Sequence, residues 1–201
     1  SMLFLAWGVG LFAVISLVLK NRILIFNSTA MSALAMVLVD RLPMDPFIHP
    51  MQPVLSGTPW LAIHVPIIMV SYATLAIVTL FAHVVVGVEI FAPQRREMAR
   101  RWSQLAYWYI HVGSILLIAG ILTGSIWAAS SWGRYWGWDP KEVWSLVAFL
   151  AYMAILHARF DKQIEDFGVA VGAIAAFWMI LMTYLGVNYV LAAGLFDDGF
   201  E

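Results

Sequence analysis

Long apolar runs, separated by short polar stretches, make up most of the 201-residue chain. Six of these runs are close to the roughly 20 residues that an α-helix needs to cross about 30 Å of hydrocarbon. No segment with the alternation of a β-strand interrupts them, and no long-period repeat is visible. The pattern therefore predicts six transmembrane helices, at about residues 2–19, 23–39, 61–91, 105–128, 140–157 and 167–193.

The amino-acid composition indicates an integral membrane protein. Hydrophobic residues make up 63% of the sequence and charged residues 11%, whereas about half of a soluble domain is apolar. We therefore expect an all-α, polytopic membrane helical bundle, with residues 1–201 forming one domain in the lipid bilayer. The net charge of -1 offers no basic face for nucleic acid. The sequence contains no cysteine, which excludes a thiol-based redox role for this chain.

The basic residues predict how the bundle is oriented. Eight of them follow the first, third and fifth apolar runs, namely Lys20, Arg22, Arg95, Arg96, Arg100, Arg101, Arg159 and Lys162. Arg41, Arg134 and Lys141 fall on the opposite side. The positive-inside rule then predicts that both termini and the tryptophan-rich segment at about 127–144 face the exported side. The first run has no basic region before it, so we expect a retained anchor rather than a cleaved signal peptide.

The tryptophan-rich segment is the most distinctive feature of the sequence. It holds five of the ten tryptophans, which are Trp127, Trp132, Trp136, Trp138 and Trp144. Indole rings offer rigid apolar surface on which a flat ligand can stack, and the glycines among them let the backbone approach closely. Tryptophan also gathers at membrane interfaces where it binds no ligand. Both interpretations are open at this point, although an interface belt does not require this order of glycine, Asp-Pro and Lys-Glu.

The same segment contains the start of a helix. Asp139 suits the N-cap, Pro140 the first helical position, and Glu142 the third position of a capping box. A helix N-terminus flanked by Arg134 and Lys141 is also a receptor for carboxylates, such as the propionates of a porphyrin. The structural and the ligand-binding interpretations are compatible.

Histidines supply the candidate metal ligands. His64 lies just inside the outer end of the third run, whereas His157 follows Pro140 at a depth of about 26 Å for a rise of 1.5 Å per residue. These two histidines therefore cannot bind the same iron. His83 and His111 belong to the inner half, and His49 lies in an outer loop. Neutral imidazole is a common haem ligand, but a single histidine near a helix end is often an interface residue.

Several of these segments resemble one family. Residues 120–128, the Trp-Gly-Trp-Asp-Pro-Lys-Glu run at 136–142 within residues 132–144, and residues 156–159 resemble the tryptophan-rich "WWD" signature of the CcsA/ResC cytochrome c biogenesis proteins. Residues 64–73 resemble the histidine-bearing helix of that family, and residues 184–188 its last helix. The resemblance extends from about Trp60 to Leu195, and the first two runs match in hydrophobicity alone.

The resemblance implies a function in handling haem. It implies delivery of haem b across a bacterial inner (plasma) or thylakoid membrane and its attachment to apocytochrome c, as a component of a holocytochrome c synthase with a CcsB/ResB-like partner. His157 matches the inner haem ligand of the family, with the second ligand coming from the partner, and His64 matches one of two outer axial histidines. The residues expected to hold the macrocycle and its carboxylates are Trp127, Trp132, Trp136, Trp138, Trp144, Arg134, Asp139 and Lys141.

One position departs from the family pattern. The family usually has a second outer histidine just after the last helix, where this chain has Phe196. Phenylalanine cannot ligate iron, so the outer haem has one protein ligand, or His49 or a partner supplies the other, or the chain no longer performs synthesis.

Two other functional classes are open to a sequence of this kind. A membrane cytochrome of the b type needs paired histidines at matching depth, which His83, His111 and His157 offer in the inner half. A transporter without a cofactor needs a polar path through the bilayer, for which the second run offers Asn27, Ser28, Thr29 and Ser32.

Overall fold

The computed structural model describes residues 58–191, with side chains to residue 187, and scattered positions between residues 10 and 37. Most of the first two predicted helices, both termini, His49 and Phe196 therefore lie outside the described residues. Every element within residues 58–191 is helical. The all-α class is confirmed for this part of the chain, and the predicted total of six spans and the placement of the termini stay predictions.

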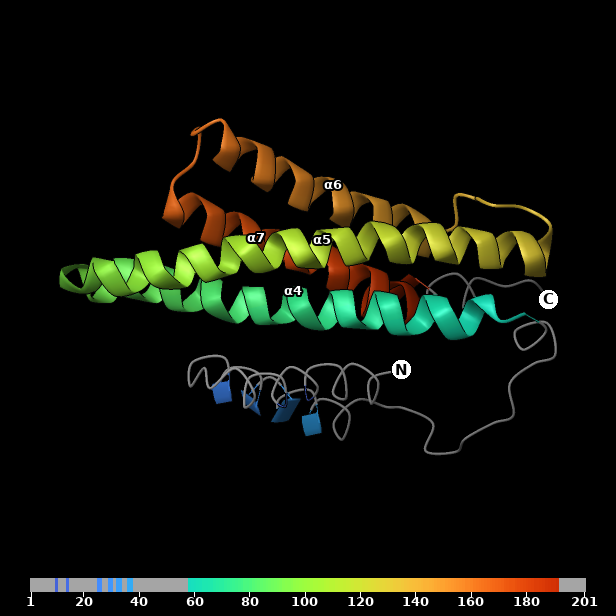
Figure 1. The fold of residues 1–201 in the computed structure, drawn as a ribbon, viewed down its shortest axis with the longest axis horizontal. Helices are drawn as coiled ribbons and strands as arrows, with labels where there is room; N and C mark the ends of the chain where they lie inside the picture. The colour runs from blue at the N-terminus through green and yellow to red at the C-terminus, as the bar shows by residue number, and fades with distance from the viewer. Residues whose placement is uncertain are drawn as a thin grey trace.

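Two helical hairpins make up the described bundle (Figure 1). Their elements in order are α4 (Trp60–Phe91), η1 (Pro93–Arg95), α5 (Arg96–Trp132), α6 (Pro140–Phe160), α7 (Asp166–Leu181) and the π-helix η2 (Met182–Leu191). The long helices α4 and α5 lie side by side, with α6 and α7 packed against them. The α4–α5 and α6–α7 connections lie at one end of the bundle and the α5–α6 connection at the other. The basic residues of the two former connections thus share one end.

Four helical segments among the described residues are long and apolar enough to cross a membrane. The predicted helix at 61–91 agrees with α4, and the one at 140–157 agrees with α6 except that α6 continues to Phe160. Helix α5 begins at Arg96 rather than near residue 105. Its first turns are charged, and Arg100 donates to Glu97 at 3.0 Å one turn earlier. Hydropathy marks the hydrocarbon span, so it missed a helical extension that continues beyond it.

Glycines on α5 let it approach α4 closely. A Cβ added at Gly113 would lie 2.6 Å from Leu75 Cδ2, and one added at Gly120 would lie 2.6 Å from Ile68 Cδ1 and 3.3 Å from Ile68 Cα. The hydroxyl of Ser71 donates across the same interface to the Gly113 carbonyl at 2.8 Å. Without a hydrophobic driving force between helices in lipid, such backbone approach and interhelical hydrogen bonds hold transmembrane helices together.

The core lies along the middle of α4. Leu75, Ile77 and Phe81 are fully buried. Phe81 packs edge-on against Trp102 at 5.3 Å and against Tyr109 at 5.8 Å between ring centroids, both of them on α5. Edge-to-face pairs of this kind add about 0.5–1.5 kcal/mol beyond the area that they bury. The α4–α5 hairpin therefore contains much of the core against which α6 and α7 pack.

A polar cluster fixes the hairpin α6–α7 at the basic end. Asp166, in the first turn of α7, accepts hydrogen bonds from Arg159 at 2.8 Å and from Ser103 of α5 at 2.9 Å. Arg159 also donates to the Ile164 carbonyl at 3.3 Å. The turn between α6 and α7 is thus tied to α5 through one carboxylate.

Replacing Gly120 with isoleucine should destabilise the bundle, because the new side chain meets the backbone of α4 at Ile68. Overpacking of this kind costs about 1–3 kcal/mol, so the thermal unfolding midpoint in detergent should fall by several degrees. Gly87→Ile is the matched control, since a Cβ at Gly87 has no atom within 4 Å. Equal midpoints for the two variants would show that the close approach at Gly120 is not needed.

Candidate functional site

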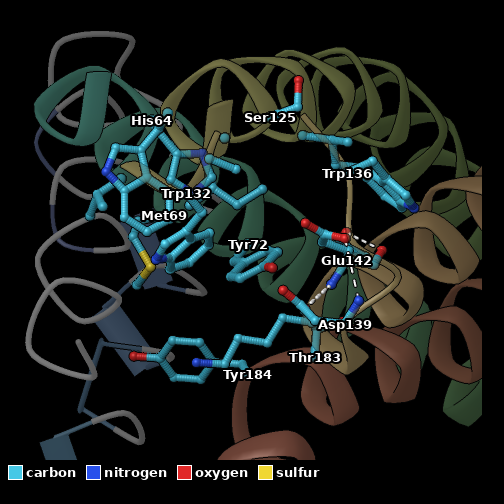
Figure 2. Close-up of a pocket in the computed structure, with 18 residues that line it drawn as sticks. His64, Met69, Tyr72, Ser125, Trp132, Trp136, Asp139, Glu142, Thr183 and Tyr184 are labelled. Carbon is cyan, nitrogen blue, oxygen red and sulfur yellow. Dashed lines mark hydrogen bonds between the residues drawn. The ribbon is translucent and has the colours of Figure 1, made fainter. Parts of the chain in front are cut away.

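A pocket of about 410 Å³ lies where the N-terminal part of α4, the end of α5 and the start of α6 meet. We call it the outer pocket, because it lies at the end of the bundle for which the sequence predicts the exported side. Figure 2 shows His64 and Trp132 on one side of it and Trp136, Asp139 and Glu142 on the other. Its lining also includes Met69, Tyr72, Trp127, Lys141, Thr183 and Tyr184.

His64 is held by the backbone of α5. Its Nδ1 donates to the Gly120 carbonyl at 2.8 Å. Because a carbonyl oxygen only accepts, the proton of the neutral ring is on Nδ1 and the lone pair is on Nε2. A Cβ at Gly124 would lie 2.8 Å from Cε1 and 2.9 Å from Nδ1 of this ring. Glycine at 124 therefore makes the space in which the imidazole lies.

Tryptophans from the end of α5 form an aromatic wall. Trp127 and Trp132 pack edge-on with their ring centroids 4.7 Å apart. The indole nitrogen of Trp127 is buried and makes no hydrogen bond within the described part of the chain. Since an indole N–H is a donor only, Trp127 has an unsatisfied donor within the described residues, and the same residue lines the pocket.

The start of α6 forms the polar side of the pocket, and the predicted capping box is confirmed. Asp139 Oδ1 accepts from the Glu142 amide at 3.0 Å. Glu142 Oε2 accepts from the Asp139 amide at 3.3 Å and from the Gly137 amide at 2.7 Å. The third bond extends the capping box into the connection between the helices. Glu142 thereby fixes the shape of the segment that carries Trp136.

The connection itself is shorter than the predicted loop at 127–144. Helix α5 continues through Trp132 and ends at Gly133, whose φ of 72° is left-handed, as glycine allows. Trp127 and Trp144 are therefore helical residues. Trp138 also has a positive φ, of 60°, which is an unusual conformation for a bulky residue. Strained backbone of this kind persists where neighbouring contacts determine the conformation, and it is common near functional sites.

The structure brings six of the predicted outer residues together and leaves three aside. His64, Trp127, Trp132, Trp136, Asp139 and Lys141 line the outer pocket, whereas Arg134, Trp138 and Trp144 do not. Trp138 is 72% exposed, and its ring packs edge-on against that of Trp136 with 5.9 Å between the ring centroids. The Arg134 guanidinium covers Gly137 so closely that a Cβ there would collide with it. Only one of the two predicted cations, Lys141, is thus part of the lining.

Other lining residues were not predicted. Met69, Tyr72, Thr183 and Tyr184 all line the outer pocket. Tyr72 is two turns after His64 on α4, so the spacing of residues on one helical face could have identified it. Thr183 and Tyr184 belong to the π-helix η2, for which the hydropathy pattern has no signal.

His157 lies elsewhere, in a second pocket of about 390 Å³ that we call the inner pocket. Its lining consists of Tyr107, His111, Ser114 and Ile115 of α5 with Met153, Leu156, His157 and Phe160 of α6. His64 and His157 thus line different pockets. His83 is exposed on α4 and lines neither of them. Within the described residues, no group of three or more histidine, aspartate or glutamate side chains is placed to hold a metal ion.

The fold and the site define a membrane-embedded helical protein with an aromatic pocket and one histidine at its wall. A family model described as cytochrome C assembly protein matches residues 1–193. Among curated proteins, the chain is 33% identical to the cytochrome c biogenesis protein CcsA of Guillardia theta, over 99% of this chain and 74% of that protein. The chain belongs to the cytochrome c assembly family, and cytochrome c biogenesis is the process that it serves.

Two further relatives carry the same description. CcsA of Thermosynechococcus vestitus is 29% identical over 99% of this chain and 76% of its own length. CcsA of Prochlorococcus marinus strain NATL1A is 33% identical over 75% of this chain and 58% of its own length. The chain thus spans between about half and three quarters of the length of these relatives. The family resemblance inferred from the tryptophan-rich segment is confirmed.

Replacing Glu142 with alanine should loosen the α5–α6 connection, because the Gly137 and Asp139 amides lose their acceptor. Each lost bond of this charge-assisted type costs about 1.5–3 kcal/mol. Hydrogen–deuterium exchange of residues 133–139 should therefore accelerate at least ten-fold. Glu165→Ala is the control, since Glu165 precedes α7 without making a side-chain cap. Unchanged exchange in Glu142→Ala would mean that the tryptophans alone fix the connection.

Proposed function

We propose that this chain binds haem in the outer pocket and presents it for covalent attachment to apocytochrome c. The observation that carries this proposal is the position of His64. A neutral imidazole with its lone pair on Nε2 lines a cavity walled by Trp127, Trp132 and Trp136. Imidazole ligates haem iron, and aromatic walls suit a flat macrocycle.

The pocket also fits the polar edge of haem. Lys141 can meet a propionate, and the indole N–H of Trp127, which has no partner among the described residues, can donate to an oxygen. Lys141 lies at the N-terminus of α6, where negative charge is favoured. The carboxylates of Asp139 and Glu142 accept backbone amides at the N-terminus of α6, which partly offsets their negative charge.

The chemistry that such a site supports is mainly orientation. In attachment, the two thiols of a Cys-x-x-Cys-His segment add across the vinyl groups of haem, and each S–H becomes a C–S and a C–H bond. His64 would hold the iron, the tryptophans would fix the ring plane, and the vinyl edge would face the apocytochrome. Good orientation alone contributes about 7–11 kcal/mol in well-aligned reactions.

Sidedness follows from the basic end of the bundle. The residues concerned are Arg95 of η1, Arg96, Arg100 and Arg101 at the start of α5, Arg159 at the end of α6 and Lys162 after it. They flank the α4–α5 and α6–α7 connections, which share one end of the bundle (Figure 1). The positive-inside rule assigns that end to the cytoplasm. The outer pocket then faces the exported side, where apocytochromes are matured. The membrane would be the bacterial inner membrane or the thylakoid membrane.

The inner pocket fits an earlier step of the same function. His157 would hold haem that enters from the basic end, before haem reaches the outer pocket. A CcsB/ResB-like membrane protein would be the partner in synthesis, and this chain would be one component of a holocytochrome c synthase. Haem b is the cargo in both pockets.

Removing the aromatic wall should release haem from the outer pocket. In Trp132→Ala/Trp136→Ala, two stacking contacts of about 0.5–1.5 kcal/mol each are lost, so haem affinity should fall roughly ten-fold and cytochrome maturation with it. Haem occupancy of the purified protein and thioether formation on a reporter apocytochrome measure this.

The control for that variant is Trp178→Ala. Trp178 is 63% exposed and lines neither the outer nor the inner pocket. If the double variant and the control lose haem and maturation equally, or neither does, the tryptophans form an interface belt and the outer pocket is not the haem site.

A further inference from the structure

The end of α5 and its connection to α6 expose large aromatic side chains beside the outer pocket. Trp132, Tyr135 and Trp138 are 47%, 67% and 72% exposed, and we call these three residues the aromatic rim. Trp132 also lines the outer pocket. The Trp138 ring packs edge-on against Trp136, another lining residue, with 5.9 Å between the ring centroids. The wall of the outer pocket therefore continues onto the surface of the protein.

The backbone of Trp138 is held in a conformation that a bulky side chain disfavours. Its φ of 60° is in the left-handed region. Glu142 Oε2 accepts hydrogen bonds from the amides on both sides of this residue, from Gly137 at 2.7 Å and from Asp139 at 3.3 Å. The Arg134 guanidinium lies against Gly137, where an added Cβ would collide with it. These neighbours determine the conformation at Trp138 and keep its ring exposed.

A lipid interface does not require such a conformation. Tryptophan and tyrosine in an interface belt need only reach the headgroups, which an unstrained backbone also allows. Strained backbone is found mainly where it serves a function. In addition, tryptophan, tyrosine and arginine are the residues that contribute most to binding energy at protein interfaces. The connection exposes one of each, in Arg134, Tyr135 and Trp138. These features favour a polypeptide as the occupant of this surface.

The chemistry proposed for the outer pocket puts a polypeptide at the same place. Thioether formation requires the cysteine thiols of the apocytochrome to reach the vinyl carbons of haem, so the Cys-x-x-Cys-His segment has to cross the mouth of the pocket. Trp132 belongs both to the pocket lining and to the exposed surface, which places the aromatic rim at that mouth. Sulfur packs favourably against aromatic rings, and a protonated imidazole is attracted to the face of an indole. The aromatic rim thus suits both side-chain types of the segment.

We propose that the aromatic rim is the docking surface for the apocytochrome segment, and that Trp138 contacts this segment rather than haem. The proposal rests on the proposed function, in which haem occupies the outer pocket. Trp136 then forms part of the haem site and also supports the Trp138 ring. The left-handed backbone at residue 138 serves to present that ring to the polypeptide substrate.

The positive φ allows the ring of Trp138 to be tested separately from its backbone. Glycine adopts this φ without strain, so Trp138→Gly removes the ring and leaves the conformation of the connection allowed. Trp138→Ala removes the ring but keeps the strain. The thermal unfolding midpoint of the glycine variant should therefore equal or exceed that of the alanine variant. The reverse order would overturn the left-handed backbone on which the proposal depends.

Lys162 provides the matched control for the glycine substitution. It also has a positive φ, of 57°, and it lies in the α6–α7 connection at the opposite end of the bundle (Figure 1). Lys162→Gly thus changes the backbone in the same way and leaves the aromatic rim intact. Trp138→Phe is a second control, because it keeps an aromatic ring at the surface.

The test uses the full chain with haem bound and a fluorescein-labelled Cys-x-x-Cys-His peptide whose two cysteines are S-methylated. The methyl groups keep the sulfur atoms and prevent thioether formation, so fluorescence anisotropy measures docking alone. Trp138→Gly should weaken peptide binding by about ten-fold or more, as expected for the loss of a tryptophan from the centre of an interface. Trp138→Phe should recover most of the affinity, and Lys162→Gly should not change it. Haem occupancy should be the same in all of these variants.

Three results would overturn the docking surface. Unchanged peptide affinity in haem-loaded Trp138→Gly would assign the ring to the lipid interface. Loss of haem from Trp138→Gly, to the extent expected for Trp132→Ala/Trp136→Ala, would assign the ring to the haem site. A haem-loaded parent that binds no peptide would show that no docking surface is present. The proposed function fails in a different way, since the parent chain would then retain no haem and form no thioethers.

Discussion

The close approach of α4 to α5 is the constraint on which the other features depend. Gly113 and Gly120 bring the two backbones together, and the His64 imidazole then reaches the Gly120 carbonyl across the interface. One carbonyl thus fixes both the proton position on the ring and the place of the ring at the pocket wall. A larger residue at 120 would separate the helices and move His64 away from its acceptor. The contacts at Gly120 therefore affect both the stability of the bundle and the position of the His64 ring.

One carboxylate, that of Glu142, holds the backbone of the α5–α6 connection beside the outer pocket. Glu142 binds two amides of the α5–α6 connection while its own amide is capped by Asp139. These bonds compensate for the backbone strain at Trp138, which a bulky residue adopts only where its neighbours determine it. The same bonds leave Lys141 as the charge of the lining that is not used in the cap. The capped start of α6 therefore also forms the polar side of the outer pocket.

Sequence predicted those parts of the molecule that depend on local chemistry. The lengths of the apolar runs predicted the bounds of α4 and α6 closely, and Asp139, Pro140 and Glu142 predicted the start of α6. The sequence does not indicate the direction in which a ring points. The prediction therefore grouped Trp138 and Trp144 with the tryptophans that line the outer pocket. Depth placed both His111 and His83 in the inner half, but only His111 lines the inner pocket together with His157. Which face of a helix a histidine occupies relative to its neighbours depends on the packing between helices, which hydropathy does not contain.

The two pockets share α5, and this has a consequence for how the sequence can change in evolution. His111 faces the inner pocket and Gly124 the outer one, and an uninterrupted helix joins them. At about 3.6 residues per turn, inserting or deleting one residue between them would rotate one pocket wall by about 100° against the other. Changes of length in this stretch would thus break one site whichever way the helix shifts. Relatives should vary in length in their connections and keep the interval between residues 111 and 124 constant.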